Sequence, residues 1–166
     1  MLRVTFYAYG RGAIIDGDEG KKGKGSKTGH AFVQFRKNDV RQTVGFNPAE
    51  DDTFFSEVGK LDVDEGRYIA HANDGGTSRC FQIRDQDERL FNEALGVAYA
   101  WIAEKRSYVL GIQDCISFVY AVAGALGLAH GGIVTTGDIF PVAAVNSIRL
   151  NDGADPVNGP ITFVQL

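Results

Sequence analysis

The chain has 166 residues, of which 44% are hydrophobic and 23% are charged, and this composition predicts a single folded domain over residues 1–166. The formal net charge is −4, so no basic excess is available to neutralise phosphates, which argues against general nucleic-acid binding. The two cysteines, Cys80 and Cys115, do not make a disulfide framework, and a single bridge between them would need an oxidising compartment.

No stretch of the chain predicts a membrane helix or a secretory signal peptide. The longest apolar runs are broken by Asp, Glu, Lys or Gly and fall short of the roughly 18 residues that a membrane helix needs. The N-terminal apolar run is also too short for a signal peptide, because Gly10 and Gly12 interrupt it. We therefore expect no transmembrane segment. The location of the protein stays open, including export by a specialised secretion route.

The first part of the chain predicts strands separated by a long loop. β-forming residues favour a strand over Leu2–Tyr9, and seven glycines then predict a long loop over Gly10–Gly29. This loop completes neither a phosphate loop, whose lysine is replaced by Ser26, nor a calcium loop, whose later ligands are missing. Residues 30–36 and 41–46 then predict a hairpin with Asn38 and Asp39 as its turn.

The rest of the chain predicts a mixture of strands and helices. In chain order we expect a helical turn at Phe54–Val58, strands over Gly66–Ala72 and Ser78–Ile83, a helix capped by Asp85 and ending near Lys105, an extended segment over Tyr108–Gln113, a helix over Asp114–Gly127, a loop over Leu128–Gly137, a short helix capped by Asp138 and reaching Ile148, and a strand over Thr162–Leu166. These elements predict an α+β fold, in which a mostly antiparallel sheet packs against two main helices.

The segment Asp114–Gly127, DCISFVYAVAGALG, places a thiol at the start of an apolar helix. Asp114 is a good N-cap, and Gly127 suits the left-handed residue that ends a helix. The positive end of the helix dipole favours the thiolate form of Cys115, which is the nucleophilic form. The alternative is that Cys115 is simply a small buried residue of a core helix.

A thiol nucleophile needs a base, and the chain offers three histidines. His30 begins a strand of the hairpin, His71 lies in another predicted strand, and His130 lies in a glycine-rich loop. In sites of the papain type the nucleophile begins a helix and the base comes from a facing strand, which favours the pair Cys115 and His30.

The third member of such a site would hold the imidazole in one orientation. If Asn38 and Asp39 form a two-residue turn, positions that sum to 77 lie opposite each other, so Asn47 faces His30. Asn47 could equally be a strand-end residue before Pro48. Gln42 and Thr43 are the alternatives for this third position, because a slip of one residue would bring Gln42 to the relevant face.

The helix with its tail, DCISFVYAVAGALGL, resembles the cysteine motif of NlpC-type cell-wall peptidases, which have Asp-Cys-Ser-Gly-Phe-Val, an apolar helix and Gly-Leu. The matching positions are Asp114, Cys115, Phe118, Val119, Gly127 and Leu128. Ile116 and Ser117 depart from the usual Ser-Gly. GHAFVQF, with His30, precedes the cysteine, and this order is similar to the circularly permuted branch, which includes lecithin–retinol acyltransferase-like proteins.

The resemblance implies a papain-like, permuted NlpC-type fold and hydrolysis of an amide bond without a metal or other cofactor. It implies Cys115 as nucleophile, His30 as base and Asn47 as the orienting residue. Related peptidases use a tyrosine upstream of the cysteine for the oxyanion, which implies Tyr108 beside the Cys115 N–H. The implied substrate is a peptide of bacterial peptidoglycan. A small amidase of this kind could be a toxin effector with a cognate immunity or inhibitor protein.

Other function classes stay open on the sequence. A lipid acyltransferase or phospholipase of the same fold is disfavoured, because the Asn-Cys-Glu-His-Phe signature and a basic amphipathic stretch are missing. A non-catalytic binding module on this fold is another alternative. A zinc site of Cys115, His30, His71 and Cys80 would lack the short ligand spacings typical of zinc. A serine hydrolase would lack its G-x-S-x-G motif. The sequence assigns no role to Cys80.

Overall fold

The computed structural model describes residues 1–10, 28–49, 54–63, 65–73, 76–131 and 140–164. The main sheet contains, in chain order, β1 (Leu2–Tyr9), β2 (His30–Lys37), β3 (Val40–Pro48), β5 (Gly59–Asp62), β6 (Thr77–Ile83) and β8 (Ile161–Val164). A separate pair consists of β4 (Phe55–Ser56) and β7 (Tyr108–Val109). The helical elements are η1 (Glu65–Tyr68), α1 (Ile69–Asn73), η2 (Asp85–Asp87), α2 (Glu88–Ala103), α3 (Cys115–Ala125) and α4 (Pro141–Ser147). Among the described residues, no helix has the length and apolar character to cross a membrane.

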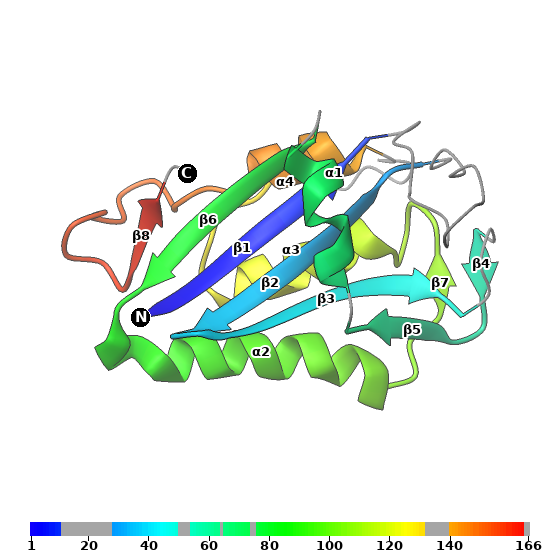
Figure 1. The fold of residues 1–166 in the computed structure, drawn as a ribbon, viewed down its shortest axis with the longest axis horizontal. Coiled ribbons are helices and arrows are strands. Elements are labelled where there is room, and N and C mark those ends of the chain that lie inside the picture. The colour runs from blue at the N-terminus through cyan, green and yellow to red at the C-terminus, as the bar shows by residue number, and fades with distance from the viewer. Residues whose placement is uncertain (11–27, 50–53, 64, 74–75, 132–139, 165–166) are drawn as a thin grey trace.

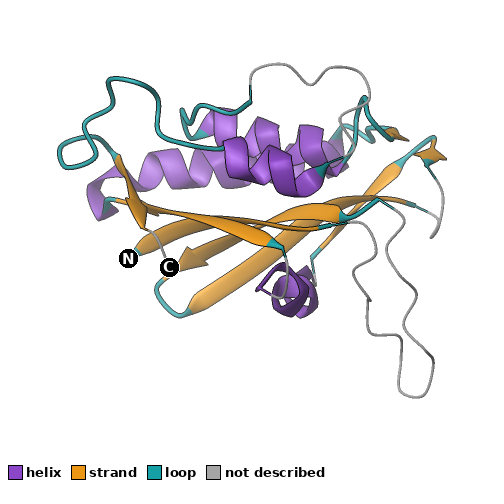
Figure 2. Ribbon diagram, turned by 90° about the horizontal axis from the view of Figure 1, so that it is seen from above, coloured by secondary structure: helices purple, strands orange, loops and turns teal. Residues whose placement is uncertain are grey.

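The expected α+β architecture is confirmed. The six strands of the main sheet lie in the order β5-β3-β2-β1-β6-β8, and each neighbouring pair is antiparallel. Helices α2, α3 and α4 cover one face of this sheet, whereas α1 lies on the opposite face (Figures 1 and 2). The sequence predicted α2 and α3 as the two main helices, and α4 joins them on the same face.

The β2–β3 hairpin has the predicted turn and register. Its ladder pairs Lys37 with Val40 at the turn and Val33 with Val44 at its far end, so each pair sums to 77. The two-residue turn is possible because Asn38 adopts a positive φ of 54°, which asparagine tolerates better than most residues. The hairpin register therefore follows from the turn chemistry alone.

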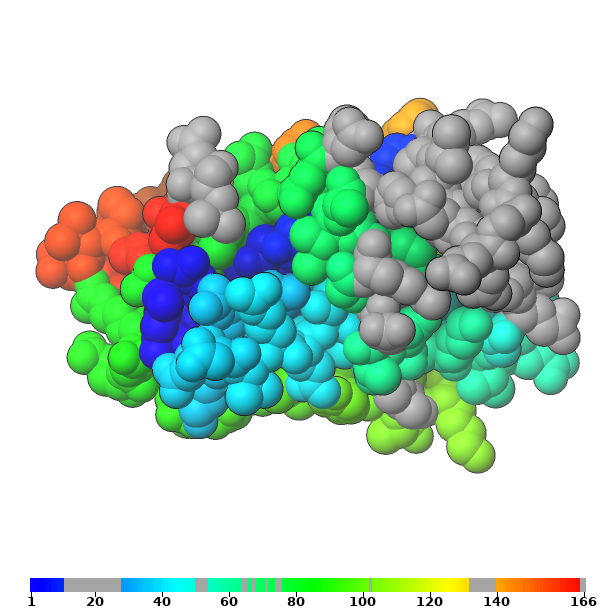
Figure 3. All heavy atoms as spheres, viewed as in Figure 1, coloured from blue at the N-terminus to red at the C-terminus, as the bar shows by residue number. Residues whose placement is uncertain are grey.

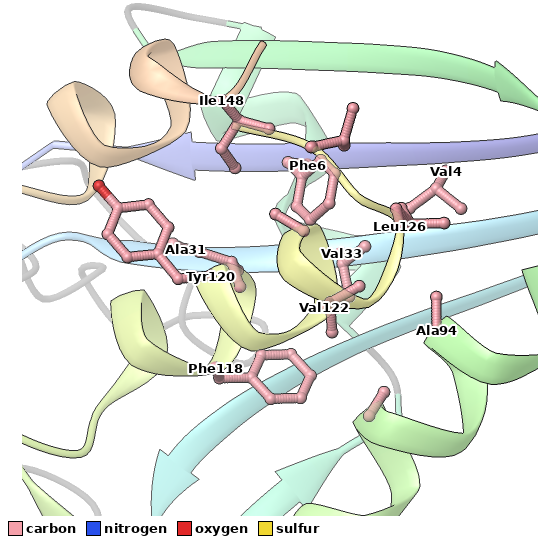
Figure 4. Packing of buried hydrophobic residues seen from close by; sticks show 14 of the residues in the cluster. Val4, Phe6, Ala31, Val33, Ala94, Phe118, Tyr120, Val122, Leu126 and Ile148 are labelled. Atoms are coloured by element: carbon pink, nitrogen blue, oxygen red, sulfur yellow. The ribbon is translucent and has the colours of Figure 1, made fainter. Parts of the chain in front are cut away.

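The core lies between the sheet and the three helices on its covered face. Helix α3 crosses the middle strands and sends its apolar side chains toward them, as Figure 4 shows for Phe118, Val122 and Leu126. The facing strand positions include Val4 and Val33, which are fully buried. Buried side chains occur along almost the whole length of α3, so close packing fixes the position of this helix against β2.

Residues 66–72, which the sequence predicted as a strand, instead form the end of η1 and most of α1. Tyr68, Ile69 and Ala72 pack on a small cluster with Tyr7, Tyr9 and Phe32 on the second face of the sheet. Spacings of three and four residues bring Tyr68, Ile69 and Ala72 to one side of a helix, which a strand would not do. Tertiary packing has overridden the local preference here.

Two other predictions need correction. The helical turn at Phe54–Val58 is absent: Phe55 and Ser56 form β4, whose backbone pairs with β7. Asp85 does not cap α2, because it begins η2, where Arg84 occupies the N-cap position without a side-chain hydrogen bond. The predicted cap Asp138 lies outside the described residues. The last strand, expected over Thr162–Leu166, is β8 and pairs with β6.

We expect the Phe118→Ala substitution to destabilise the protein by about 3–5 kcal/mol, since it leaves a cavity at the centre of the core. Phe118 is 0% exposed, and its ring centroid lies 5.5 Å from that of Trp101 and 6.4 Å from that of Phe46. Urea unfolding followed by circular dichroism measures the change. The matched control is Phe163→Ala, at a side chain that is 38% exposed, for which we expect a loss of about 1 kcal/mol. Equal losses for the two variants would contradict this description of the core.

Candidate active site

Asp114 caps α3, as predicted from the sequence, and its carboxylate is almost completely buried. Oδ1 accepts from the backbone N–H groups of Ile116 (3.0 Å) and Ser117 (3.1 Å), and the side chain is 1% exposed. Oδ2 accepts from the backbone N–H of Gly111 at 2.7 Å. A single carboxylate therefore fixes both the first turn of α3 and the loop that leads into it.

The loop before α3 is a tight turn that brings Tyr108 back to the start of the helix. Val109 and Gln113 exchange backbone hydrogen bonds of 2.9 and 2.8 Å, so the chain reverses between them. Gly111 lies in this turn with a φ of 80°, a conformation that favours glycine. The reversal places Tyr108 next to Asp114 and Cys115 although it lies seven positions before the cysteine.

The Tyr108 hydroxyl lies close enough to the Cys115 thiol for the two groups to influence each other's ionisation. Burial raises the pKa of Tyr108 well above its ordinary value, and the neighbouring Cys115 and Asp114 raise it further. The Tyr108 hydroxyl therefore keeps its proton and can donate to the sulfur or to an oxygen beside it. Cys115 itself is a free cysteine with 3% exposure at the first position of α3. The structure thus brings together two of the residues that the sequence singled out.

Tyr9, which the sequence did not single out, lies near both Tyr108 and His30. Its hydroxyl is close enough to Tyr108 to make a small contribution to the raised pKa of Tyr108. On its other side, Tyr9 pairs with His30 across the β1–β2 ladder, and the centroids of the two rings are 5.9 Å apart. Cys115, Tyr108, Tyr9 and His30 therefore all lie near the same end of the sheet. Only the position of Tyr9 at the end of a predicted strand could have signalled this.

Gly29 determines how the chain enters β2 just before His30. It has a φ of 78°, and a Cβ at this position would lie 2.4 Å from the carbonyl oxygen of Tyr9. No other residue fits so close to a neighbouring backbone without a shift. The glycine therefore helps to hold the start of β2 against the end of β1.

The thiol and the imidazole belong to different sides of the sheet. Cys115 packs in the core on the face that α3 covers, whereas the His30 ring stacks on Phe32 with a centroid distance of 5.9 Å and an angle of 22°. Phe32 and Tyr9 belong to the cluster that α1 covers on the second face. His30 is the first residue of β2, so its ring lies at the end of the sheet. The direct thiol–imidazole contact expected from the sequence stays a prediction.

Asn47 lies on β3 beyond the part of this strand that pairs with β2. The β2–β3 ladder ends at Val33 and Val44, after which β3 leaves β2 and pairs with β5, so that Asn47 lies opposite Lys60 (Figure 1). The expected pairing of His30 with Asn47 therefore does not occur in the sheet. The reason is that the two strands diverge at the end where α3 begins.

The two alternative third members have other partners. Gln42 donates a hydrogen bond to the hydroxyl of Tyr99 in α2, on the helix-covered face. Thr43 accepts a hydrogen bond from the Gln34 side chain at 3.0 Å, and both side chains are buried. Neither interaction places these residues against the His30 ring.

The remaining histidines and Cys80 lie in other parts of the fold. Cys80 is buried on β6, where it pairs with Thr5 of β1 and lies near Tyr7, and His71 is part of α1. The His130 ring stacks on Tyr120 with a centroid distance of 4.4 Å, and desolvation lowers its pKa. Within the described ranges, no group of three His, Cys, Asp or Glu side chains is arranged to hold a metal ion.

Comparison of the chain with protein-family models, with curated proteins and with solved structures found no match.

We expect Asp114→Ala to lower the free energy of unfolding by about 2–4 kcal/mol, because it removes an N-cap and leaves the buried Gly111 N–H unpaired. Asp114→Asn should lose less, since its side-chain oxygen can still accept from Ile116 and Ser117. Urea unfolding of the two variants provides the test. A loss in Asp114→Asn as large as that in Asp114→Ala would show that the cap bonds at Oδ1 are not what stabilises the helix start.

Proposed function

We propose that the protein is a cysteine hydrolase that cleaves an amide bond, with Cys115 as its nucleophile. The observation that carries this proposal is the position of Cys115 as the first residue of α3, where the Asp114 cap fixes the helix start and the turn after Tyr108 brings the Tyr108 hydroxyl close to the thiol. A buried hydroxyl that keeps its proton beside a helix-terminal thiol is suited to stabilising negative charge that develops there. A purely structural cysteine would not need such a donor.

In the first step the Cys115 sulfur attacks the carbonyl carbon of the amide, and His30 accepts the thiol proton. The carbonyl oxygen becomes an oxyanion, which the backbone N–H of Cys115 and the Tyr108 hydroxyl stabilise by donating to it. Collapse of this tetrahedral intermediate breaks the C–N bond. His30 returns its proton to the leaving nitrogen, and the acyl group stays on sulfur as a thioester.

In the second step water hydrolyses the thioester. His30 removes a proton from the water, the resulting tetrahedral intermediate uses the same two donors, and the sulfur leaves and regains its proton from His30. The products are a carboxylic acid and an amine, and the enzyme returns to its starting state. No cofactor enters this balance.

Both steps need a movement at the end of the sheet. Cys115 is 3% exposed, so a substrate carbonyl reaches the sulfur only when the groups around it shift. The His30 ring must also approach the sulfur past Tyr9, around the end of β1 and β2. In this proposal Tyr9 positions the ring, and Asn47 as the orienting residue stays a prediction. Catalytic hydrogen bonds are often long before substrate binds, and substrate binding would then complete the site.

The motif Asp114-Cys115 with its apolar helix supports peptides of bacterial peptidoglycan as the substrate class. This part of the proposal rests on the resemblance to NlpC-type peptidases and on the residues that carry it. An amide in such a peptide offers the acyl carbon and the leaving nitrogen that the two steps require.

Incubation with purified peptidoglycan, followed by mass analysis of the soluble fragments, tests the activity. We expect the wild-type chain to release fragments with a new carboxylate and a new amine, and Cys115→Ala and His30→Gln to release none. Cys80→Ala is the matched control, because it removes the other buried thiol, and it should keep the activity. Circular dichroism checks that each variant is folded. Fragment release by Cys115→Ala would overturn the mechanism.

The Tyr108→Phe variant tests the oxyanion role separately. Removal of one donor should lower kcat about 10²- to 10³-fold with little change in KM, since the donor acts on the transition state. The measurement is steady-state hydrolysis of a peptide that the previous experiment identifies as a substrate. Tyr99→Phe is the control: it also deletes a tyrosine hydroxyl, but one that pairs with Gln42. An unchanged kcat in Tyr108→Phe would exclude its hydroxyl as an oxyanion donor.

A further inference from the structure

Three arginines lie side by side on adjacent strands of the main sheet. Arg3 of β1 pairs with Arg36 of β2, and Arg36 pairs with Arg41 of β3. Residues that pair directly across antiparallel strands project to the same face of a sheet. Because Val4 and Phe35, their neighbours along the strands, are core residues on the helix-covered face, the arginines belong to the second face. We name these three residues the arginine row.

The arginine row lies at the end of the sheet away from the candidate active site. Helix α1 covers the second face nearer the other end, where it packs beside Tyr7 and Tyr9 (Figure 1). Figure 3 shows this face, and atoms of β1 and of the β2–β3 hairpin form its surface near the N-terminus. Arg41 is exposed, and Arg3 and Arg36 are partly buried. The row is therefore part of the molecular surface.

Among the described residues, the arginines of the row have no acidic partner. Arg36 donates from Nε to the backbone oxygen of Asn38 at 2.8 Å, which leaves the rest of its guanidinium available. Arg3 Nε is buried and has no hydrogen-bond partner. Within the part of the chain that the structure describes, none of the three forms an ion pair. A buried N–H donor without an acceptor is costly, and this cost adds to that of placing the three positive charges side by side.

Placing like charges directly opposite one another in a sheet also lowers stability. The chain accepts this cost twice, between Arg3 and Arg36 and between Arg36 and Arg41, although its net charge is −4 and it has 21 acidic residues from which partners could come. Guanidinium groups bind carboxylates through two parallel hydrogen bonds, which makes a fixed row of them selective for regularly spaced carboxylates.

We propose that the arginine row is a docking surface for an acidic helix of a partner protein. Neighbouring strands are about 5 Å apart, so the row spans about 10 Å. Carboxylates at positions i, i+4 and i+7 of a helix are spaced by about 6 and 4.5 Å along its axis and span about the same length. Such a helix would lie across the strands, with one carboxylate for each arginine. The net charge of −4 opposes approach to extended polyphosphates, which favours a protein partner with a local acidic stripe.

Fluorescence anisotropy with a labelled alanine-based helical peptide tests this proposal. The peptide carries Glu at i, i+4 and i+7, and its matched control carries Gln at the same positions. We expect the wild-type protein to bind the Glu peptide, more weakly as salt rises, and to bind the Gln peptide at least about tenfold more weakly. The Arg3→Gln, Arg36→Gln, Arg41→Gln triple variant should bind the Glu peptide about tenfold more weakly than the wild type does.

The control variant removes three positive charges elsewhere, through Arg89→Gln, Lys105→Gln and Arg149→Gln, and should bind the Glu peptide like the wild type. If the triple variant of the row does not fold, the exposed Arg41→Gln alone should weaken binding by about two- to fivefold. Equal binding of the Glu and Gln peptides, or equal losses in the row and control variants, would overturn the proposal. Tighter binding of a DNA duplex or of phosphatidylglycerol vesicles than of the Glu peptide would overturn the choice of partner. Hydrolysis of peptidoglycan is a separate readout, which substitutions in the row should leave unchanged.

Discussion

The candidate active site depends on one buried carboxylate. The Asp114 carboxylate is buried, and burial of a carboxylate is costly unless its oxygens accept hydrogen bonds. Backbone N–H groups of the preceding loop and of α3 donate these bonds. The same bonds determine where α3 begins, and therefore where the Cys115 sulfur lies. They also hold the turn that returns Tyr108 to the sulfur. The stability of the helix start and the geometry of the thiol are thus consequences of one interaction.

The divergence of β3 from β2 is the second constraint on the site. At this end of the sheet β3 pairs with β5, and Tyr108 of β7 packs against Phe46 of β3, with a centroid distance of 5.6 Å. The divergence gives the start of α3 its place beside the sheet, but it also separates Asn47 from the pairing that would have put it opposite His30. A flat, fully paired hairpin would have kept that pair and lost the space for Tyr108.

The parts of the structure that the sequence predicted are those with local signals. The Asp114 cap and the Asn38–Asp39 turn each depend on a few consecutive residues, so the start of α3 and the hairpin register could be predicted. The helix within residues 66–72 could not be predicted, because it is stabilised by packing against aromatic rings of β1 and β2, which are distant in the sequence. Tyr108 was found through a resemblance to known peptidases. The proximity of Tyr9 to both Tyr108 and His30 depends on sheet pairing and on a turn about a hundred residues away.

The order of side chains along β1 separates the candidate active site from the proposed docking surface. Tyr9 ends the strand beside His30, whereas Arg3 near its beginning belongs to the arginine row, and six residues of extended chain put about 20 Å between them. A partner helix on the row would therefore not cover the thiol, which also lies on the other face of the sheet. Any influence of such a partner on hydrolysis would have to travel along β1 and β2, whose far ends carry Tyr9 and His30. Because these two strands are paired along their whole length, they would form a rigid connection between the proposed docking surface and the groups that the proposed mechanism requires to move.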